Sequence, residues 1–477
     1  MSSSLISWKR TVISVSLSCC LLLSGCSLML TDYERPALPQ ADSFAHAQNF
    51  LGPQIGEQYW QLFNDAKLDA LIDKALTVNY DLNDAYLNVL AARAQLGLTA
   101  TNAHPSLNSS ISGNVTKDLS SGNAHQESTS STLGLSYEAD LFGRLAAARR
   151  SAAENFQASA YDYWAMRLSI VEAVGSAYWQ YAYAKEALAL GEQDLKASER
   201  RLSLVQALYQ AGAADGLDYD TARVNHLGVV DSLEQRRQQM YAAHNALCIL
   251  LNVPPQTNLD IATLDSAQQP QFSLVLPAQL LSRRPDLQAA EARLRAALAG
   301  SDEARLNFYP QFNLTASLTA GDGAALARLL SDPIGALGAA ITFPFLNYNE
   351  LSYAEDAALV ELDRAKLSFV NTYLTALQET ADAIDNVNYY AQAVTTMAQR
   401  AALAQMNYQR YEARYRAGAC PLTDLLDASD TARMATLSLL EVKRGHLQAL
   451  LTLMTAIGGD NQEAHTQSLM QEVLTQN

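Results

Sequence analysis

The chain has 477 residues, of which 49% are hydrophobic and only 17% are charged, and it contains just 13 prolines. This length exceeds one ordinary hydrophobic core, and the scarcity of charge and proline indicates an elongated molecule. The 49 acidic residues outnumber the 33 basic ones, giving a formal charge of −16, which argues against nucleic acid or an anionic membrane surface as a partner.

Residues 1–25 have the pattern of a signal peptide. A basic pair, Lys9 and Arg10, precedes an apolar run that is too short to span a bilayer and ends in the string Leu-Ser-Gly-Cys at Cys26. This string resembles a bacterial lipobox, which implies that Cys26 becomes the lipid-modified first residue. Ser27, in place of an aspartate, implies export to the outer membrane. An ordinary signal peptide with a chance cysteine is the alternative.

Residues 26–477 form the expected mature chain. No apolar run after Cys26 has the length that a membrane-spanning helix needs, so covalent lipid on Cys26 is the expected anchor. Only Cys248 and Cys420 remain, too few for a disulfide framework. The helices described next place them near opposite ends of the molecule, and we expect both to stay unpaired.

The chain is internally duplicated. The segment 209–218, YQAGAADGLD, matches the segment 415–424, YRAGACPLTD, at an offset of 206 residues, and blocks further upstream match at an offset of 205. A duplication of about 205 residues predicts two repeats with the same order of elements. We place these structural repeats at about 60–255 and about 280–460.

Each repeat is predicted to contain one very long helix. The stretches 106–253 and 345–420 contain no proline, and both carry apolar residues at the 3-4 spacing of a coiled-coil seam. The predicted rods would each reach roughly 100 Å at 1.5 Å per residue and end at an Ala-Gly cap. The expected helices are the rods Arg144–Ala211 and Glu350–Ala417, the returning helices Asp218–Asn252 and Asp424–Ile457, and the short helices Asp81–Ala103 and Asp286–Asn307.

Strands are predicted only between each short helix and its rod, at about 106–141 and 310–347. Apolar and small polar residues alternate there, and long loops rich in Gly, Ser and Asp separate the two members of each pair. The edge of a soluble sandwich would show a similar alternation. Four strands cannot close a barrel, and an open edge cannot lie in lipid, so membrane strands would require oligomerisation. Three chains would supply twelve strands.

Five strings place the chain in a family: Tyr137-Glu-Ala-Asp-Leu-Phe-Gly-Arg144, Arg283-Arg-Pro-Asp-Leu287, Phe308-Tyr-Pro310, Thr375-Ala-Leu-Gln-Glu379 and Tyr415-Arg-Ala-Gly418. They resemble the recurrent blocks of outer-membrane factors of the TolC and OprM type, particularly the lipoprotein branch. The resemblance implies a mainly α fold with a small β part. It also implies a homotrimer with a long α-helical barrel, a twelve-stranded barrel in the outer membrane of a Gram-negative cell, and a belt from Glu57–Leu76 and the segment after Gly459.

The resemblance also implies the function. Such proteins are passive exit ducts for drugs or other small solutes that dock on a periplasmic adaptor and an inner-membrane transporter. Aspartates near the tips ring the periplasmic mouth, and here they correspond to Asp424, Asp427 and Asp218. Tyr415 matches a tyrosine that helps hold the mouth shut. Helix capping is the alternative for Asp218 and Asp424, and both roles could hold together.

The tips show one departure from the family pattern. An arginine that is common two residues after the tip glycine is Cys420 here, so Arg414 or Arg416 would have to substitute for it in any lock. The tip segments Gly212 to Leu217 and Gly418 to Leu422 are expected to contact the adaptor.

No catalytic, cofactor or metal constellation accompanies these features. The histidines form no i, i+4 pair, and we found no cysteine partner at ligand spacing; they are His46, His104, His125, His226, His244, His446 and His465. Two other functions are the alternatives: a coiled-coil lipoprotein that spaces or tethers envelope layers, and an envelope hydrolase. The transported substrate is left open among drugs, metal ions, siderophores and small peptides.

Overall fold

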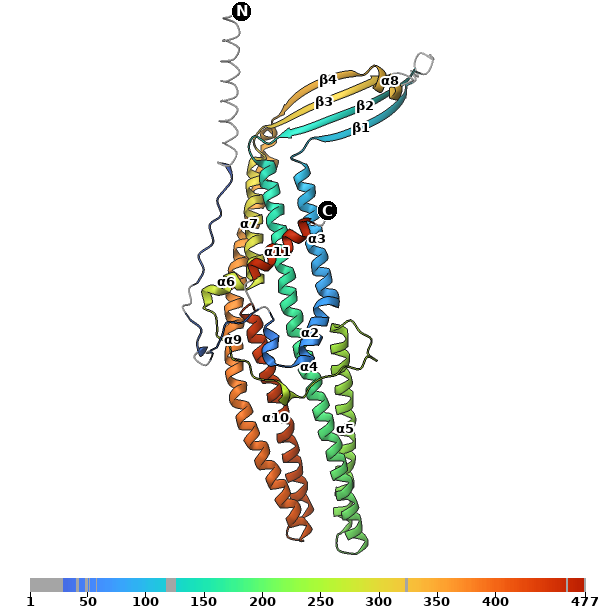
Figure 1. The fold of residues 1–477 in the computed structure, drawn as a ribbon, viewed down its shortest axis with the longest axis vertical. Coiled ribbons are helices and arrows are strands. Elements are labelled where there is room, and N and C mark those ends of the chain that lie inside the picture. The colour runs from blue at the N-terminus through green and yellow to red at the C-terminus, as the bar shows by residue number, and fades with distance from the viewer. Residues whose placement is uncertain are drawn as a thin grey trace, which may run out of the picture.

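The computed structural model describes residues 29–39, 43–47, 50, 52–56, 58–116, 126–321, 325–459 and 462–475. The chain forms an elongated helical body with a sheet that projects from one end (Figure 1). The mainly α architecture with a small β part confirms the predicted fold class. Cys26 and the signal peptide lie outside the described residues. In the described part of the chain, no helix has both the length and the apolar character needed to cross a bilayer.

Two very long helices run through the body, as the proline-free stretches predict. They are α4, Arg144–Gln210, and α9, Tyr348–Arg416. The returning helices are α5, Gly216–Leu250, and α10, Leu422–Ala456. The short helices are α3, Tyr80–Thr101, and α7, Pro285–Leu306. Smaller elements are η3 Tyr59–Phe63, α2 Ala66–Val78, η4 Leu264–Ser266, η5 Pro277–Gln279, α6 Leu280–Arg283, η6 Pro344–Asn347 and α11 Gln462–Thr475.

The helices form one layer in which neighbours alternate in direction. In the half next to the sheet the order of contact is α3, α4, α7, α9, and in the opposite half it is α5, α4, α10, α9 (Figure 1). Each long helix therefore spans both halves, and two shorter helices stacked end to end run beside it. This arrangement confirms the predicted long helical hairpins.

The largest core lies at mid-height, where η3 and α2 pack against α4 and α10. Phe63 and Trp179 meet edge to face with ring centroids 4.8 Å apart. Asp65 caps α2 by accepting from the backbone N–H groups of Lys67 and Leu68, and its other oxygen accepts from the hydroxyl of Tyr178 at 2.7 Å. The predicted belt segment thus attaches to the long helix through a buried, fully hydrogen-bonded carboxylate, although Glu57 itself lies outside the described residues.

Asp69 on α2 gives this region a pH dependence. Burial, with Asp65 and Asp73 nearby, raises the pKa of Asp69 from 3.8 to about 6. The folded state therefore holds the proton of Asp69 more tightly than the unfolded chain does. The free energy of unfolding that this proton contributes is fully present below about pH 4 and is lost as the pH rises through about 6. We expect Asp69→Asn to melt at a higher temperature than the parent at about pH 7.5, and at a similar temperature near pH 4. Thermal melting at both pH values checks this.

Asp356→Asn, at an exposed position of α9 away from Asp69, is the matched control. It should leave the melting temperature of the protein unchanged relative to the parent at both pH values. A stabilisation by Asp69→Asn that was equal at both pH values would contradict the assignment of the proton to Asp69.

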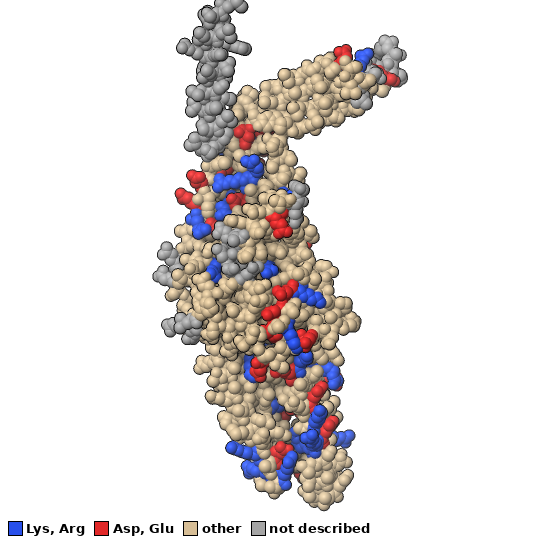
Figure 2. Space-filling view, viewed as in Figure 1, with Lys and Arg blue, Asp and Glu red and all other residues tan. Residues whose placement is uncertain are grey.

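The sheet has the order β1-β2-β3-β4 and is antiparallel throughout. Its strands are β1 Ser106–Thr116, β2 Gln126–Ala139, β3 Gln311–Gly321 and β4 Ile334–Thr342, with helix α8, Ala325–Ser331, between the last two. The register places apolar side chains on one face, such as Leu107 opposite Leu135, and hydroxyl and amide side chains on the other. Glu127 and Glu138 are the only charged residues in the strands. Figure 2 accordingly shows charge gathered on the helical body and nearly absent from the sheet except near its far end.

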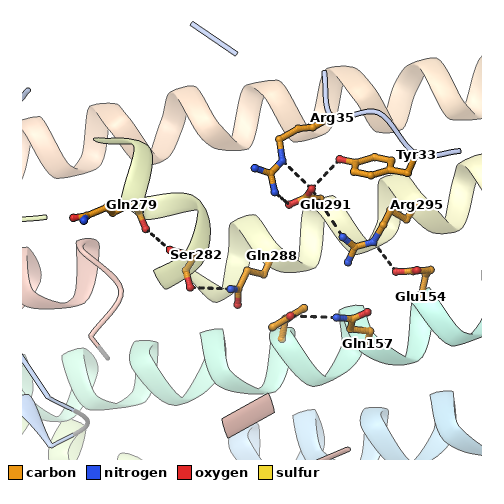
Figure 3. Close-up of polar contacts among 10 residues, drawn as sticks. Tyr33, Arg35, Glu154, Gln157, Gln279, Ser282, Gln288, Glu291 and Arg295 are labelled. Carbon is orange, nitrogen blue, oxygen red and sulfur yellow. Dashed lines mark hydrogen bonds and ion pairs between the residues drawn. The ribbon is translucent and has the colours of Figure 1, made fainter. Parts of the chain in front are cut away.

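Residues 29–39, which we call the N-terminal strap, run along the outside of α7. Glu291 of α7 accepts from the hydroxyl of Tyr33 and from two guanidinium nitrogens of Arg35, each at 2.9 Å (Figure 3). Asp302, further along α7, accepts from the backbone N–H and the hydroxyl of Thr31 at 2.8 and 2.6 Å. The strap is therefore held by two nearly buried carboxylates of one helix.

Candidate functional site at the helical tips

Both hairpins end in the same cap. Gly212 and Gly418 adopt φ values of +72° and +70°, a left-handed conformation that glycine accepts without strain. The N–H of each glycine donates to a carbonyl three residues back, and the N–H of the following residue reaches back to Leu208 in one tip and Arg414 in the other, at 2.8 Å. The predicted tips therefore lie where the sequence placed them.

An apolar cluster, which we call the tip cluster, joins the two hairpins. Its buried members are Val205, Ala222, Leu422, Leu425 and Leu426, with Leu202, Tyr219, Tyr408, Tyr411 and Tyr415 packed around them. The side chain of Leu422 is only 3% exposed, so its predicted place on a contact surface is corrected: it packs inside the tip. Leu217 is 74% exposed, and Gly212 and Gly418 are exposed as well.

The predicted gate aspartates do not cap their helices. Asp215 is the N-cap of α5, where its carboxylate accepts from the N–H of Asp218 at 2.8 Å, and Pro421 occupies the N-cap of α10. Asp218 and Asp424 are therefore not N-cap residues, but both lie in the first turn, where the helix dipole favours a negative charge as the alternative expected. Both are partly exposed in the first turn of their helices, and Asp427 is exposed one turn further along.

Tyr415 lies between the two hairpins. Its pKa is raised first by burial, then by the negative charge of Asp218 on the other hairpin and by Cys420. The phenol therefore remains protonated and available as a hydrogen-bond donor near a carboxylate. Arg414 lies 5.6 Å from the centre of the Tyr411 ring and donates to the carbonyl of Ala419.

Arg416, the other possible substitute for the missing arginine, pairs with Glu412 at 2.8 Å on the same helix. The thiol of Cys420 donates to the carbonyl of Tyr411 at 3.7 Å. Both arginines and the cysteine thus make these contacts within the α9/α10 tip, and the contact across the hairpins consists of apolar and tyrosine packing.

One histidine, His244, has a cysteine one helical turn away. His244 and Cys248 are four residues apart, and the thiol lies 3.7 Å from each ring nitrogen, so the statement that no cysteine stands at ligand spacing was wrong. The ring also contacts the carbonyl of Thr257 at 2.9 Å. Within the described residues no three side chains of the metal-binding types come together. Cys248 and Cys420 are both free thiols, as predicted.

Comparison with known proteins identifies the chain's family. The family model for outer membrane efflux proteins matches residues 71–253 and 276–459, one range over each predicted repeat. The chain belongs to the outer membrane efflux protein family. Outer membrane protein OprJ of Pseudomonas aeruginosa is 33% identical over 470 residues, covering 92% of this chain and 94% of OprJ. The pyoverdine export outer membrane protein OpmQ of the same species is 30% identical over 456 residues, covering 93% and 96%.

Solved channels of this kind share the fold of this outer membrane efflux protein. The Campylobacter jejuni CmeC outer membrane channel superposes with a TM-score of 0.85 at 22% identity, covering 94% of this chain and 98% of that one. A CusC structure gives 0.80 at 27% identity, covering 90% and 99%. The protein is an outer-membrane efflux channel component and not an enzyme, which confirms the predicted function and excludes the spacer and hydrolase alternatives.

Proposed function

We propose that three copies of this chain form one passive exit duct that works with a periplasmic adaptor and an inner-membrane transporter. The observation that carries the proposal is the sheet: β1 and β4 are edge strands that pair with no further strand in the described chain, while one face is apolar. Hydrocarbon cannot satisfy the unpaired backbone groups of an open edge. Hydrogen bonding of β4 of one copy to β1 of the next copy would satisfy these backbone groups.

The strap supports lipid anchoring through Cys26. Thr31 is fixed to Asp302 near the sheet end of α7, and Cys26 precedes Thr31 by five residues. Five residues span at most about 18 Å, so a lipid on Cys26 would lie close to the level at which the sheet begins. Anchor and sheet would then enter the same membrane.

The tips support a gate role for Asp218, Tyr415, Asp424 and Asp427. Three copies bring nine of these carboxylates to one mouth, where they attract cations and repel one another. Tyr415 and the tip cluster hold the two hairpins of each chain together against this repulsion. Exposed Gly212, Leu217 and Gly418 are available for the adaptor, and opening requires the tip cluster to separate.

The named relatives support a duct that does not select its own cargo. The pyoverdine export protein OpmQ, the cation efflux protein CusC of Escherichia coli and the toluene efflux pump protein TtgC of Pseudomonas putida each match more than nine tenths of this chain. Solutes so different in size and charge share one outer-membrane architecture. We infer that the partner transporter selects the solute and that this chain supplies passage.

Conductance in planar bilayers tests the gate. The parent protein is expected to form cation-preferring channels that divalent cations block. The double variant Asp424→Ala, Asp427→Ala should lose part of both properties, because the mouth loses six carboxylates in a trimer. The matched control, Asp260→Ala with Asp265→Ala, removes the same charge from a loop remote from the tips and should conduct like the parent. Unaltered selectivity in the first variant would remove these aspartates from the mouth, and absence of conductance in the parent would refute the duct.

A further inference from the structure

We propose that His244 and Cys248 of α5 form a binding site for a soft monovalent metal ion, Cu(I), at mid-height of the chain. Cys248 belongs to the largest core, and His244 lies one helical turn before it. Helix α5 ends there, at its upper end in Figure 1, beside the loop that contains Thr257. The site goes beyond the proposed duct and does not depend on it, because all of its residues belong to one chain.

The ring of His244 has one nitrogen fixed by the backbone. Its Nε2 lies 2.9 Å from the carbonyl oxygen of Thr257, and because a carbonyl only accepts, Nε2 carries the hydrogen. In the neutral ring the second nitrogen, Nδ1, then keeps its lone pair. A histidine that binds a metal usually donates its other N–H to a carbonyl or carboxylate in this way, which fixes the orientation of the ring. The contact with Thr257 therefore leaves Nδ1 of His244 as a ligand atom.

The sulfur of Cys248 lies at the separation that a bridging ion needs. It is 3.7 Å from Nδ1. Metal bonds of about 2.3 Å to sulfur and about 2.0 Å to nitrogen span about 3.7 Å when they meet at about 120°, and about 4.3 Å in a straight line, so an ion fits between the two atoms after a shift of about 0.6 Å or less. The sulfur is equally far from Nε2, and a small rotation of the side chains turns the Nδ1 lone pair toward it.

The surroundings of the pair are largely dry. Cys248 is 1% exposed, and Tyr181 of α4, which is 7% exposed, meets the ring of His244 edge to face with centroids 5.2 Å apart. His244 itself is partly exposed, so an ion reaches the thiol past the imidazole. A thiolate and an imidazole suit a soft ion, whereas harder ions prefer carboxylates, carbonyls and water.

Charge decides between the soft ions. When the metal binds, the Cys248 sulfur gives its proton to water and forms a bond to the ion, and no electron is transferred. With Cu(I) the group of ion, thiolate and imidazole is neutral, whereas Zn(II) leaves a net positive charge, which burial disfavours. Lys74 of α2 adds to this preference. Its positive charge lowers the pKa of the Cys248 thiol against the larger, opposite effect of burial, so it also repels any surplus positive charge at the sulfur.

Retention of Cu(I) by the purified protein in detergent tests the site. The parent for this test carries Cys420→Ser, which removes the other described thiol. It is loaded with Cu(I) under anaerobic conditions and desalted, and atomic absorption should find about one copper per chain. The variant that adds Cys248→Ser should retain no copper above background. Zn(II) offered in the same way should be retained at least about tenfold less.

His244→Phe separates the pair from the thiol alone. A phenylalanine ring fills the same place beside Tyr181 but has no lone pair, so competition with a chromogenic Cu(I) chelator should show an affinity at least about tenfold lower. His226→Phe is the matched control, because His226 lies on the same helix and contacts Ser198 instead. Its affinity should equal that of the parent. An unchanged affinity in the His244 variant would mean that the thiol binds alone, and the site would be overturned.

X-ray absorption at the copper edge identifies the ligands without a variant. The loaded parent should show sulfur and nitrogen neighbours of the copper ion together. A Cu(I) ion surrounded by sulfur alone would overturn the site even if a variant failed to fold. Copper retained by the Cys248 variant at the level of the parent, or Zn(II) bound as tightly as Cu(I), would overturn it as well. None of these results bears on the duct, which the conductance of the parent tests separately.

Discussion

Replacing Arg284 with alanine is expected to destabilise the protein by about 1.5 to 3 kcal/mol and to lower the amount of folded protein in the outer membrane. Arg284 is 9% exposed and joins three helices near mid-height. Its guanidinium donates to both oxygens of Asp286 on α7, to Glu379 of α9 at 2.6 Å and to the last carbonyl of α10, from Ala456, at 3.1 Å. Without it, the side chains of Asp286 and Glu379, which are 37% and 51% exposed, lose their shared cation, and the last carbonyl of α10 loses a donor.

Thermal melting and the amount of protein in the outer-membrane fraction measure this effect. Arg293→Ala is the matched control, because Arg293 lies on the same helix and pairs with Asp162 where both side chains are about half exposed. An exposed pair contributes no more than about 1 kcal/mol, so this variant should behave like the parent. Equal melting temperatures for the two variants would show that Arg284 does not join the helices.

Replacing Asp302 with alanine is expected to release the N-terminal strap. Asp302 is 1% exposed and accepts two hydrogen bonds from Thr31, and a hydrogen bond to a charged group contributes about 1.5 to 3 kcal/mol. We expect limited proteolysis of the variant to cut within residues 29–39 under conditions in which the parent strap is protected. Mass spectrometry of the fragments locates the cut.

Glu234→Ala controls for the loss of a helical carboxylate. Glu234 pairs with Arg237 three residues later, as Asp302 pairs with Arg305, but it lies on α5, away from the strap. Its loss should leave the strap protected. A strap that is cut equally in the parent and in the Asp302 variant would mean that Thr31 does not hold it in place.

The elements that follow from local patterns could be predicted. The proline-free stretches, the 3-4 apolar spacing and the Ala-Gly caps together predicted the ends of α4 and α9 to within about two residues. These signals are contained in short stretches of sequence, because proline and glycine act on the backbone around them. Alternation likewise located the strands, although it could not exclude a soluble sandwich until the family was known.

The features that were missed depend on partners distant in sequence. Nothing in the strap sequence signals that Arg35 meets Glu291, 256 residues away. The burial of Leu422 was missed because it needs the second hairpin, through Val205 and Ala222, to cover it. Helix α5 begins at Gly216, two residues before the predicted start at Asp218, because the side chain of Asp215 caps it. The pairing of His244 with Cys248 was visible as one helical turn and should have been found.

The proposed duct depends most on the pairing of the two open edges of each chain with neighbouring copies. The most direct measurement is imaging of the full-length protein in lipid nanodiscs by single-particle electron microscopy. We expect three copies around a continuous central passage, with the β4 edge of each copy beside the β1 edge of the next. A single copy per disc, or three copies whose helices fill the centre, would contradict it.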